Sequence, residues 1–159
     1  MTDITTTQLF WQAYLDTLPE QHPHRFLPLP EAWGFGDSPD MADRLGALVL
    51  QGKKTATSGR YLGENLLSLA GPSIVLNGAG RPLCVVETWE ITVRRFRDMD
   101  AQFAADEGEG DRTLAYWRQA HWDFFSREGA REGYPVSPDM LLVCERFTVL
   151  FRNPDITTT

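Results

Sequence analysis

Two β-rich runs separated by a glycine-containing turn constrain the fold of this chain most strongly. Residues 73–76 and 83–93 are mainly apolar or β-branched, and Asn77-Gly78-Ala79-Gly80 lies between them. Asparagine and glycine adopt the backbone angles that tight turns between antiparallel strands need. The pattern therefore predicts a β-hairpin. Residues 54–59 and 141–151 have further strand character.

Helical segments are interspersed among these strands. Apolar spacing and capping signals predict helices at residues 5–18, 39–51, 98–106 and 112–127. Ser38, Asp98 and Asp111 are the predicted N-caps of the last three helices. Because strands and helices do not alternate regularly, we expect an α+β fold with a mixed or largely antiparallel sheet. A small β-barrel with flanking helices is the expected way for this sheet to close.

Length and hydrophobic content indicate one globular domain. The 159 residues, 42% of them hydrophobic, suffice for one core and are too few to expect two. We divide the chain into an N-terminal helix with a proline-rich connector at 1–30, the main domain at 31–152 and a disordered tail at 153–159. In the connector, His22-Pro23-His24 lacks further ligands nearby, so we interpret it as a solvated loop and predict no metal site.

Charge and cysteine usage restrict the partners and the compartment. A net charge of -7 argues against wholesale phosphate neutralisation, so we expect no extended duplex DNA binding, although a small basic pocket is compatible with this charge. Cys84 and Cys144 lie in apolar runs, which predicts buried free thiols in a reducing cytoplasm. No run approaches the roughly 18 to 20 apolar residues of a membrane span. We therefore expect a cytoplasmic protein with no membrane contact and no cofactor.

The segment 52–57 (Gly-Lys-Lys-Thr-Ala-Thr) sets two lysines beside two threonines, where a predicted helix meets a predicted strand. A lysine beside a threonine hydroxyl can serve as base and nucleophile. Alternatively, the helix macrodipole favours lysines at a helix C-terminus without any chemistry. A second cluster, 107–112 (Glu-Gly-Glu-Gly-Asp-Arg), concentrates carboxylates between two predicted helices. The combination of a basic and an acidic cluster favours the functional interpretation.

Five motifs, taken together in their order and spacing, carry a family resemblance. They are Trp33-Gly34-Phe35-Gly36-Asp37, Gly52-Lys53-Lys54-Thr55-Ala56-Thr57, Cys84-Val85-Val86-Glu87-Thr88, Glu107-Gly108-Glu109-Gly110-Asp111 and Tyr116-Trp117. They closely resemble the ASCH domain family and extend over most of the chain, from about residue 33 to residue 151. The resemblance implies a PUA-like β-barrel with flanking helices, related to domains that bind RNA.

The resemblance also implies candidate activities. Small bacterial ASCH proteins include amidohydrolases that remove the acetyl group from the exocyclic amine of acetylated cytidine. Larger relatives, which this chain resembles more, are associated with ribonuclease activity. Carried over by motif, the amidohydrolase residues fall on Lys54, Thr57 and Glu107. The chain departs from the larger subgroup after Thr57, where residues 60–72 form a short loop in place of a longer one, which affects the choice of substrate.

The implied chemistry requires a nucleophile, a proton acceptor and a proton donor for the leaving amine, and the three carried-over residues are the candidates. Lys54 acts as a base only if burial or the neighbouring Lys53 lowers its pKa, whereas a nearby Glu107 raises it. The conflict disappears if Lys54 stabilises an oxyanion while Glu107 handles protons. Because residues three apart face opposite sides of a regular strand, Lys54 and Thr57 share a pocket only if the backbone turns or bulges near Thr55.

The candidate substrate-binding residues are Lys53, Arg60, Glu87, Arg112 and Trp117. We expect Glu87, in an apolar strand, to pair with a lysine or arginine, either structurally or to orient substrate. Arg112 at a predicted helix start opposes the macrodipole, which favours a ligand or carboxylate contact. Trp117 serves either the core or the pocket. We expect His121 to lie at the surface or in a satisfied hydrogen bond, and Glu109 to solvate a loop.

Three functions are compatible with these residues. The first is a hydrolase of a small nucleoside-like amide that uses Lys54, Thr57 and Glu107. The second is an RNA-binding protein or ribonuclease acting on single-stranded RNA, in which Lys53, Lys54 and Arg60 contact phosphates and exposed aromatic rings stack on bases. The third is a non-catalytic module that binds a nucleotide or another small ligand. Substrate turnover separates the first from the third, and salt-sensitive binding is typical of the second.

Overall fold

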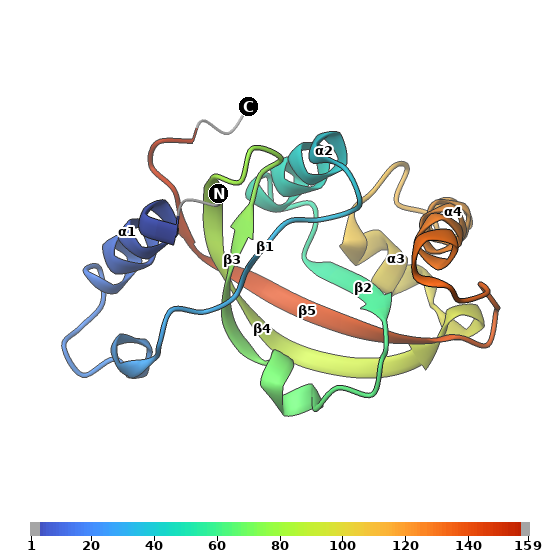
Figure 1. Ribbon diagram of the computed structural model, residues 1–159, viewed down its shortest axis with the longest axis horizontal. Helices are drawn as coiled ribbons and strands as arrows, with labels where there is room; N and C mark the ends of the chain where they lie inside the picture. The colour runs from blue at the N-terminus through green and yellow to red at the C-terminus, as the bar shows by residue number, and fades with distance from the viewer. Residues whose placement is uncertain (1–3, 157–159) are drawn as a thin grey trace.

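A single mixed sheet with four α-helices forms the fold in the computed structural model, which describes residues 4–156 (Figure 1). The helices are α1 (Ile4–Leu15), α2 (Pro39–Leu50), α3 (Ala101–Glu107) and α4 (Leu114–Glu132). The strands are β1 (Ala32–Trp33), β2 (Ala56–Arg60), β3 (Gly71–Leu76), β4 (Pro82–Arg95) and β5 (Leu141–Arg152). Short 3-10 turns occupy Pro23–Phe26, Leu66–Leu69 and Phe96–Asp98. The expected α+β class is confirmed.

The sheet has the order β1-β3-β4-β5-β2. β3 and β4 form the predicted antiparallel hairpin, and the long strands β4 and β5 pair over most of their length and curve together (Figure 1). Only β1 is parallel to its neighbour, β3, among the strands described. No ladder joins the edge strands β1 and β2 within residues 4–156. The sheet is therefore open, and closure into a barrel is unconfirmed.

Each helix or pair of helices covers a different part of the sheet. α1 packs on Ile74 and Val85, whereas α2 packs on Val75 and Val86, which alternate with them along the same strands. α3 and α4 cover Ala56 of β2 and Leu142 and Cys144 near the start of β5. Figure 1 shows α1 at one end of the molecule, α3 and α4 at the other, and α2 between them. This arrangement places α2, α3 and α4 around the edge strand β2.

One helix start agrees with prediction. Ser38 caps α2, since its hydroxyl accepts a hydrogen bond from the Met41 N–H, and Pro39 takes the first helical position, where a missing N–H costs nothing.

The predicted caps of α3 and α4 are wrong. Asp98 belongs to a 3-10 turn, and Asp100 caps α3 instead. Asp111 accepts from the Thr113 N–H, while the Thr113 hydroxyl caps α4. Arg112 has φ 67, a left-handed angle that excludes it from the helix. α4 continues past the predicted end at residue 127, as far as Glu132.

The chain ends and the cysteines complete the fold. α1 contributes to the core, and the Asn153 side chain donates to the Pro82 carbonyl oxygen at 2.8 Å. The end of the predicted tail, 157–159, lies outside the described residues. Cys84 and Cys144 are free and buried as predicted, and burial raises the pKa of each thiol to about 12. Among the described helices, none has the length and apolar character that crossing a bilayer requires.

Candidate functional site

The backbone between α2 and β2 departs from strand geometry, as the site requires. The N–H groups of Lys53 and Lys54 both donate to the Leu48 carbonyl oxygen, at 2.9 and 3.1 Å, and close the end of α2. The Thr55 N–H then donates to the Asp106 carbonyl oxygen at 2.8 Å. β2 begins only at Ala56, so Lys54 precedes the strand. The alternation rule that separates residues three apart therefore does not apply to Lys54 and Thr57.

Gly108 allows the end of α3 to approach this segment closely. It caps α3 with φ 75, a left-handed angle that favours glycine. A Cβ atom at this position would lie 2.1 Å from the Lys53 carbonyl oxygen, so any side chain would displace the backbone. The close contact sets Glu107, the last residue of α3, beside Lys54.

Lys54 is a buried cation held between two carboxylates. Its Nζ lies 3.1 Å from Glu107 Oε1 and 2.9 Å from Glu109 Oε2, and the Lys54 and Glu107 side chains are each 1% exposed. The ammonium also lies 5.2 Å from the centre of the Phe35 ring. Such a group is tolerated in the interior because it is paired and hydrogen-bonded.

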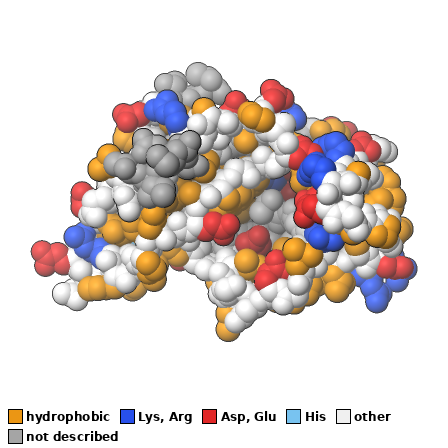
Figure 2. All heavy atoms as spheres, in the orientation of Figure 1, with side chains coloured by type: hydrophobic (Ala, Val, Ile, Leu, Met, Phe, Trp, Pro, Cys, Tyr) orange, Lys and Arg blue, Asp and Glu red, His pale blue; other side chains and the backbone are white. Residues whose placement is uncertain are grey.

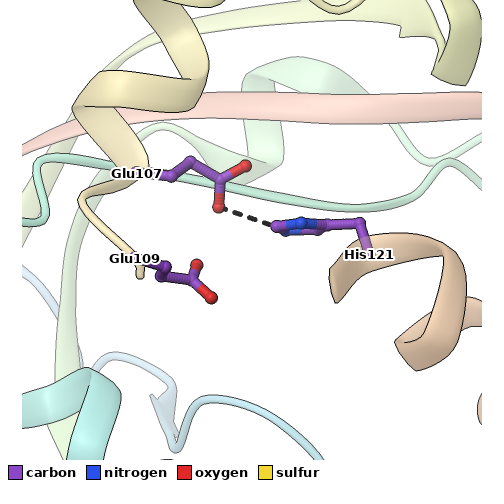
Figure 3. Close-up of side chains that lie close together, drawn as sticks. All are labelled: Glu107, Glu109 and His121. Atoms are coloured by element: carbon purple, nitrogen blue, oxygen red, sulfur yellow. Dashed lines mark ion pairs between the residues drawn. The ribbon is translucent and has the colours of Figure 1, made fainter. Parts of the chain in front are cut away.

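Glu107 receives several further contacts besides the one from Lys54. The Ser58 hydroxyl donates to its Oε2 at 2.7 Å, and the Trp117 indole N–H donates to the same oxygen at 2.5 Å. His121 Nε2 lies 3.5 Å from Oε1, the contact dashed in Figure 3. The carboxylate therefore meets donors from β2, α4 and the α2–β2 connection. These contacts hold it rigidly.

The cluster favours charged side chains. Burial alone lowers the pKa of Lys54, but the charges of Glu107 and Glu109 outweigh it and raise that pKa above its ordinary value. Burial raises the pKa of Glu107, but the Lys54 and His121 charges dominate and hold it well below its ordinary value. Lys54 is therefore an ammonium and Glu107 a carboxylate at neutral pH.

His121 completes the charge balance. Its Nδ1 lies 2.9 Å from the Trp117 carbonyl oxygen and its Nε2 faces Glu107, so both ring nitrogens face acceptors. Only the imidazolium ion donates from both nitrogens. Burial lowers the pKa of His121, but the Glu107 carboxylate raises it above its ordinary value overall. Two cations, Lys54 and His121, thus face two anions, Glu107 and Glu109.

Two adjoining hollows meet at Thr57. A small cavity of about 60 Å³ contains the Lys54 cluster and is bordered by Thr57 and Ser58 of β2 and by Phe35. A larger groove of about 550 Å³ runs over the sheet and shares five lining residues with the cavity, namely these three together with Gly36 and Phe124. Lys54, Thr57 and Glu107 therefore border one cavity, and Thr57 lies where that cavity meets the groove.

The groove is aromatic and acidic. Its walls include the rings of Trp33, Phe35, Phe124 and Phe147. Glu31, Glu128 and Glu145 also line it, whereas no lysine or arginine does so among residues 4–156. Figure 2 shows a hollow near the middle of this face, bordered by acidic side chains.

Glu145 has a defined position within the groove. It lies directly opposite Thr57 in the antiparallel β2–β5 ladder, so the two side chains share one face of the sheet. Burial raises the pKa of Glu145, the Glu31 and Glu64 charges raise it further, and a hydrogen bond with Thr88 lowers it. This carboxyl group thus differs from Glu107, whose pKa is depressed.

Among the predicted substrate-binding residues, only Trp117 reaches the cluster. It is 2% exposed and combines core packing with its bond to Glu107. Lys53 is exposed, whereas Lys54 beside it is buried. The Arg60 guanidinium packs on the Tyr134 ring, 3.6 Å from its centre, and its buried Nε lies 4.0 Å from Glu128 Oε1 without a hydrogen-bond partner among the described residues.

The expectations for Glu87 and Arg112 need correction. Glu87 pairs with His24 at 3.4 Å and not with a lysine or arginine, because the connector folds back onto β4 and brings the imidazole there. His24 also contacts the Tyr14 hydroxyl at 2.8 Å, so the connector is more than a solvated loop. Arg112 donates to the Ala105 carbonyl oxygen and pairs with no carboxylate of residues 4–156, since its left-handed backbone turns it back towards α3.

Sequence reasoning missed three residues of the cluster. Ser58 has no motif of its own beyond its place after Thr57. Glu109 belongs to the acid-rich segment but pairs with Lys54 and does not simply solvate a loop. His121 is buried and hydrogen-bonded, which agrees with one of the two expectations for it, but its place beside Glu107 was not predicted; its ring stacks at 4.2 Å on that of Trp117, four residues earlier.

Glu107, Glu109 and His121 are also the one group of described residues with the geometry to hold a metal ion, since their ligand atoms all lie within 4.8 Å of one another. Figure 3 shows the three side chains converging from the end of α3, from the loop that follows it and from α4. A metal ion there would compete with the Lys54 ammonium for both carboxylates, and His121 would have to lose a proton to bind it. The charge balance favours the internal cation.

Comparisons with known proteins agree with this architecture. The ASCH domain family matches residues 31–151. A solved ASCH domain from Lactobacillus crispatus is 30% identical, with 93% of this chain and 96% of that chain covered and a TM-score of 0.84. A solved Enterococcus faecalis protein of family DUF984 is 32% identical, with 94% and 90% covered and a TM-score of 0.79. A search of curated proteins found no match. The chain belongs to the ASCH domain family, as its motifs predicted.

Proposed function

We propose that this ASCH-domain protein hydrolyses an amide on a nucleoside-sized substrate of the acetylated-cytidine type. The observation that carries the proposal is the position of Thr57, whose side chain lies where the cavity of the buried Lys54 meets the aromatic groove. A substrate bound in the groove would present its amide to a hydroxyl nucleophile with a fixed cation nearby. Acyl transfer requires a nucleophile that attacks the carbonyl carbon and a group that stabilises the negative charge formed on the carbonyl oxygen.

The charge states favour one division of labour. Lys54 is an ammonium whose three N–H groups already have acceptors on Glu107 and Glu109, so its role is to stabilise, through its charge, the oxyanion that forms on the amide carbonyl. Glu107 keeps Lys54 charged and in place. Because Glu107 has a depressed pKa and accepts from Lys54, Ser58 and Trp117, it is a poor proton acceptor. Thr57 is the nucleophile.

The groove suits a nucleoside. Its volume of about 550 Å³ falls within the range of roughly 300 to 1,000 Å³ typical of small-molecule sites. The rings of Trp33, Phe35 and Phe124 offer surfaces on which a base can stack. The groove carboxylates can accept hydrogen bonds from ribose hydroxyls or base amines.

The RNA alternative receives less support. Phosphate binding needs free lysine or arginine side chains. The groove lining has none among the described residues, and Arg60 is engaged by Tyr134 and Glu128. Lys53 is exposed but lies apart from both hollows. A phosphate chain in the groove would also meet its three carboxylates.

Turnover of cytidine acetylated on its exocyclic amine tests the proposal. We expect the purified protein to release cytidine, detected by chromatography. Thr57→Val keeps the shape of the side chain but removes the hydroxyl, and it should abolish release. Thr57→Ser keeps a hydroxyl and should retain measurable activity. Binding of the nucleoside without any release would favour the non-catalytic alternative, and equal activity of wild type and Thr57→Val would exclude Thr57 as the nucleophile.

A further inference from the structure

Every titratable side chain of the Lys54 cluster is already protonated or already paired with a cation. Lys54 and His121 are both protonated in the charge arrangement described above. Glu107 is saturated with donors, and Glu109 binds the Lys54 ammonium at 2.9 Å. A hydroxyl nucleophile is weak unless an adjacent base removes its proton. The base must therefore come from outside the cluster.

We propose that Glu145 is the general base that activates Thr57, an inference that rests on the proposed hydrolase function. Thr57 and Glu145 are directly opposite residues of β2 and β5, and both line the groove. Side chains in such pairs have Cβ atoms about 4.5 to 5.5 Å apart. A carboxylate at this distance can reach a neighbouring hydroxyl, and such contacts often tighten only when substrate binds.

The surroundings of Glu145 suit proton transfer. β5 lies between β4 and β2, so the backbone of Glu145 is fixed on both sides. Burial and the nearby Glu31 and Glu64 carboxylates raise its pKa, and the Thr88 hydroxyl holds the side chain by a hydrogen bond that acts in the opposite direction. A carboxylate with a raised pKa is a stronger base than an ordinary one. The pKa of Glu107 is lowered, so Glu107 is a weaker base than an ordinary carboxylate.

The proposed reaction balances in two stages. In the first, Glu145 takes the Thr57 proton while Thr57 Oγ bonds to the amide carbonyl carbon. The carbon–nitrogen bond then breaks, and protonated Glu145 returns the proton to the leaving amine. In the second stage, water gives a proton to Glu145 and bonds to the acyl carbon, the ester bond to Thr57 breaks, and Thr57 Oγ regains the proton. One amide and one water yield one carboxylic acid and one amine.

The pH dependence of hydrolysis tests the base. In wild type we expect kcat to rise with pH through the titration of Glu145. Glu145→Gln should lower kcat about a hundredfold or more and remove this limb of the profile. Glu145→Asp should retain the limb with reduced activity, which shows that loss in the Gln variant is not a folding defect. Glu31→Gln removes a charge that raises the pKa of Glu145. In this variant the rise of kcat with pH should therefore occur at lower pH.

A second probe separates this inference from the proposed substrate. p-Nitrophenyl acetate should acetylate Thr57, detected by rapid quenching and intact mass, and Glu145→Gln should slow acetylation whereas Thr57→Val should abolish it. If wild type is acetylated faster than Glu145→Gln but releases no cytidine, the substrate is wrong and the base assignment stands. If amide hydrolysis or acetylation proceeds equally in wild type and Glu145→Gln, the base assignment is overturned. The proposed hydrolase function is kept in that case if cytidine is released. If Thr57 is never acetylated by either compound, the assignment is also overturned.

Discussion

Lys54 Nζ lies 3.1 Å from Glu107 Oε1, and both side chains are 1% exposed although they are 53 positions apart in the chain. The pair ties the end of α2 to the end of α3. A buried ion pair of this kind is weak evidence for net stabilisation, because both ions lose their hydration. Its specific consequence is a cation fixed at one side of the Thr57 cavity.

Removing Lys54 should strongly destabilise the protein. Lys54→Met leaves Glu107 and Glu109 without their shared cation, and breaking a buried pair from one side typically costs about 3 to 5 kcal/mol. Urea unfolding monitored by tryptophan fluorescence measures the loss. Lys53→Met is the matched control, since this neighbouring side chain is exposed and should change the free energy of unfolding by about 0.5 kcal/mol or less. Similar losses in both variants would contradict the burial of Lys54.

The His121 imidazolium should make stability depend on pH above the ordinary histidine pKa of about 6.5. Because the folded protein raises the pKa of His121, the stabilisation is fully present below the unfolded pKa of about 6.5 and is lost as pH rises through the folded pKa. The free energy of unfolding should therefore fall over that interval in wild type. His121→Gln should lack this fall, whereas His22→Gln should keep it.

Proton NMR offers a direct check of the same prediction. The chain has only three histidines, so the ring signal that disappears in His121→Gln can be assigned simply. That signal should titrate above about 6.5. A titration below this value would contradict the imidazolium assignment.

Two glycines with the same backbone angle should respond differently to alanine. Gly52 and Gly108 both have φ 75, but a Cβ at Gly52 meets nothing within 4 Å, whereas one at Gly108 lies 2.1 Å from the Lys53 carbonyl oxygen. Gly52→Ala should lower the free energy of unfolding by only about 1 kcal/mol, the cost of a left-handed backbone angle at a residue with a side chain. Gly108→Ala should lower it by about 3 kcal/mol, because the clash with the Lys53 carbonyl oxygen is added. Chemical denaturation measures both, and equal losses would refute the close approach.

The acidic groove should disfavour phosphorylated substrates. Glu31, Glu128 and Glu145 line it without a basic residue among those described, so a 5′-monophosphate would meet like charge. We expect kcat/KM for acetylated cytidine to exceed that for its 5′-monophosphate by about tenfold, a difference of roughly 1.4 kcal/mol. Added salt should narrow the difference through screening, as should Glu31→Gln. A preference for the nucleotide that weakens with salt would instead favour the phosphate-binding alternative.

Local signals explain which features could be predicted. The Asn-Gly turn and the Ser38-Pro39 cap depend on backbone preferences of adjacent residues, and both appear in the structure. Asp98 and Asp111 are equally plausible caps in sequence, but tertiary packing selected Asp100 and Thr113. A cap signal fixes a helix start only to within a few residues, because several nearby side chains can accept the same N–H.

The site was predictable in part for the same reason. Lys54, Thr57 and Glu107 stand in short motifs, so sequence reasoning could single them out, and the structure places all three around one cavity. Ser58 and His121 were missed because their roles depend on the depth at which β2 and α4 pack against Glu107. Such distances have no signature in local sequence.

The sequence by itself determined the family, the α+β class and a junction that combines lysine and threonine, because these depend on adjacent residues and on motif order. The tertiary structure decided the charge states and the partners. It buried Lys54 and left Lys53 exposed, lowered the pKa of Glu107, and set Glu145 opposite Thr57 across β2 and β5. The physical reason is that burial and long-range strand pairing set the local dielectric and the nearby charges, and these depend on segments far apart in the chain.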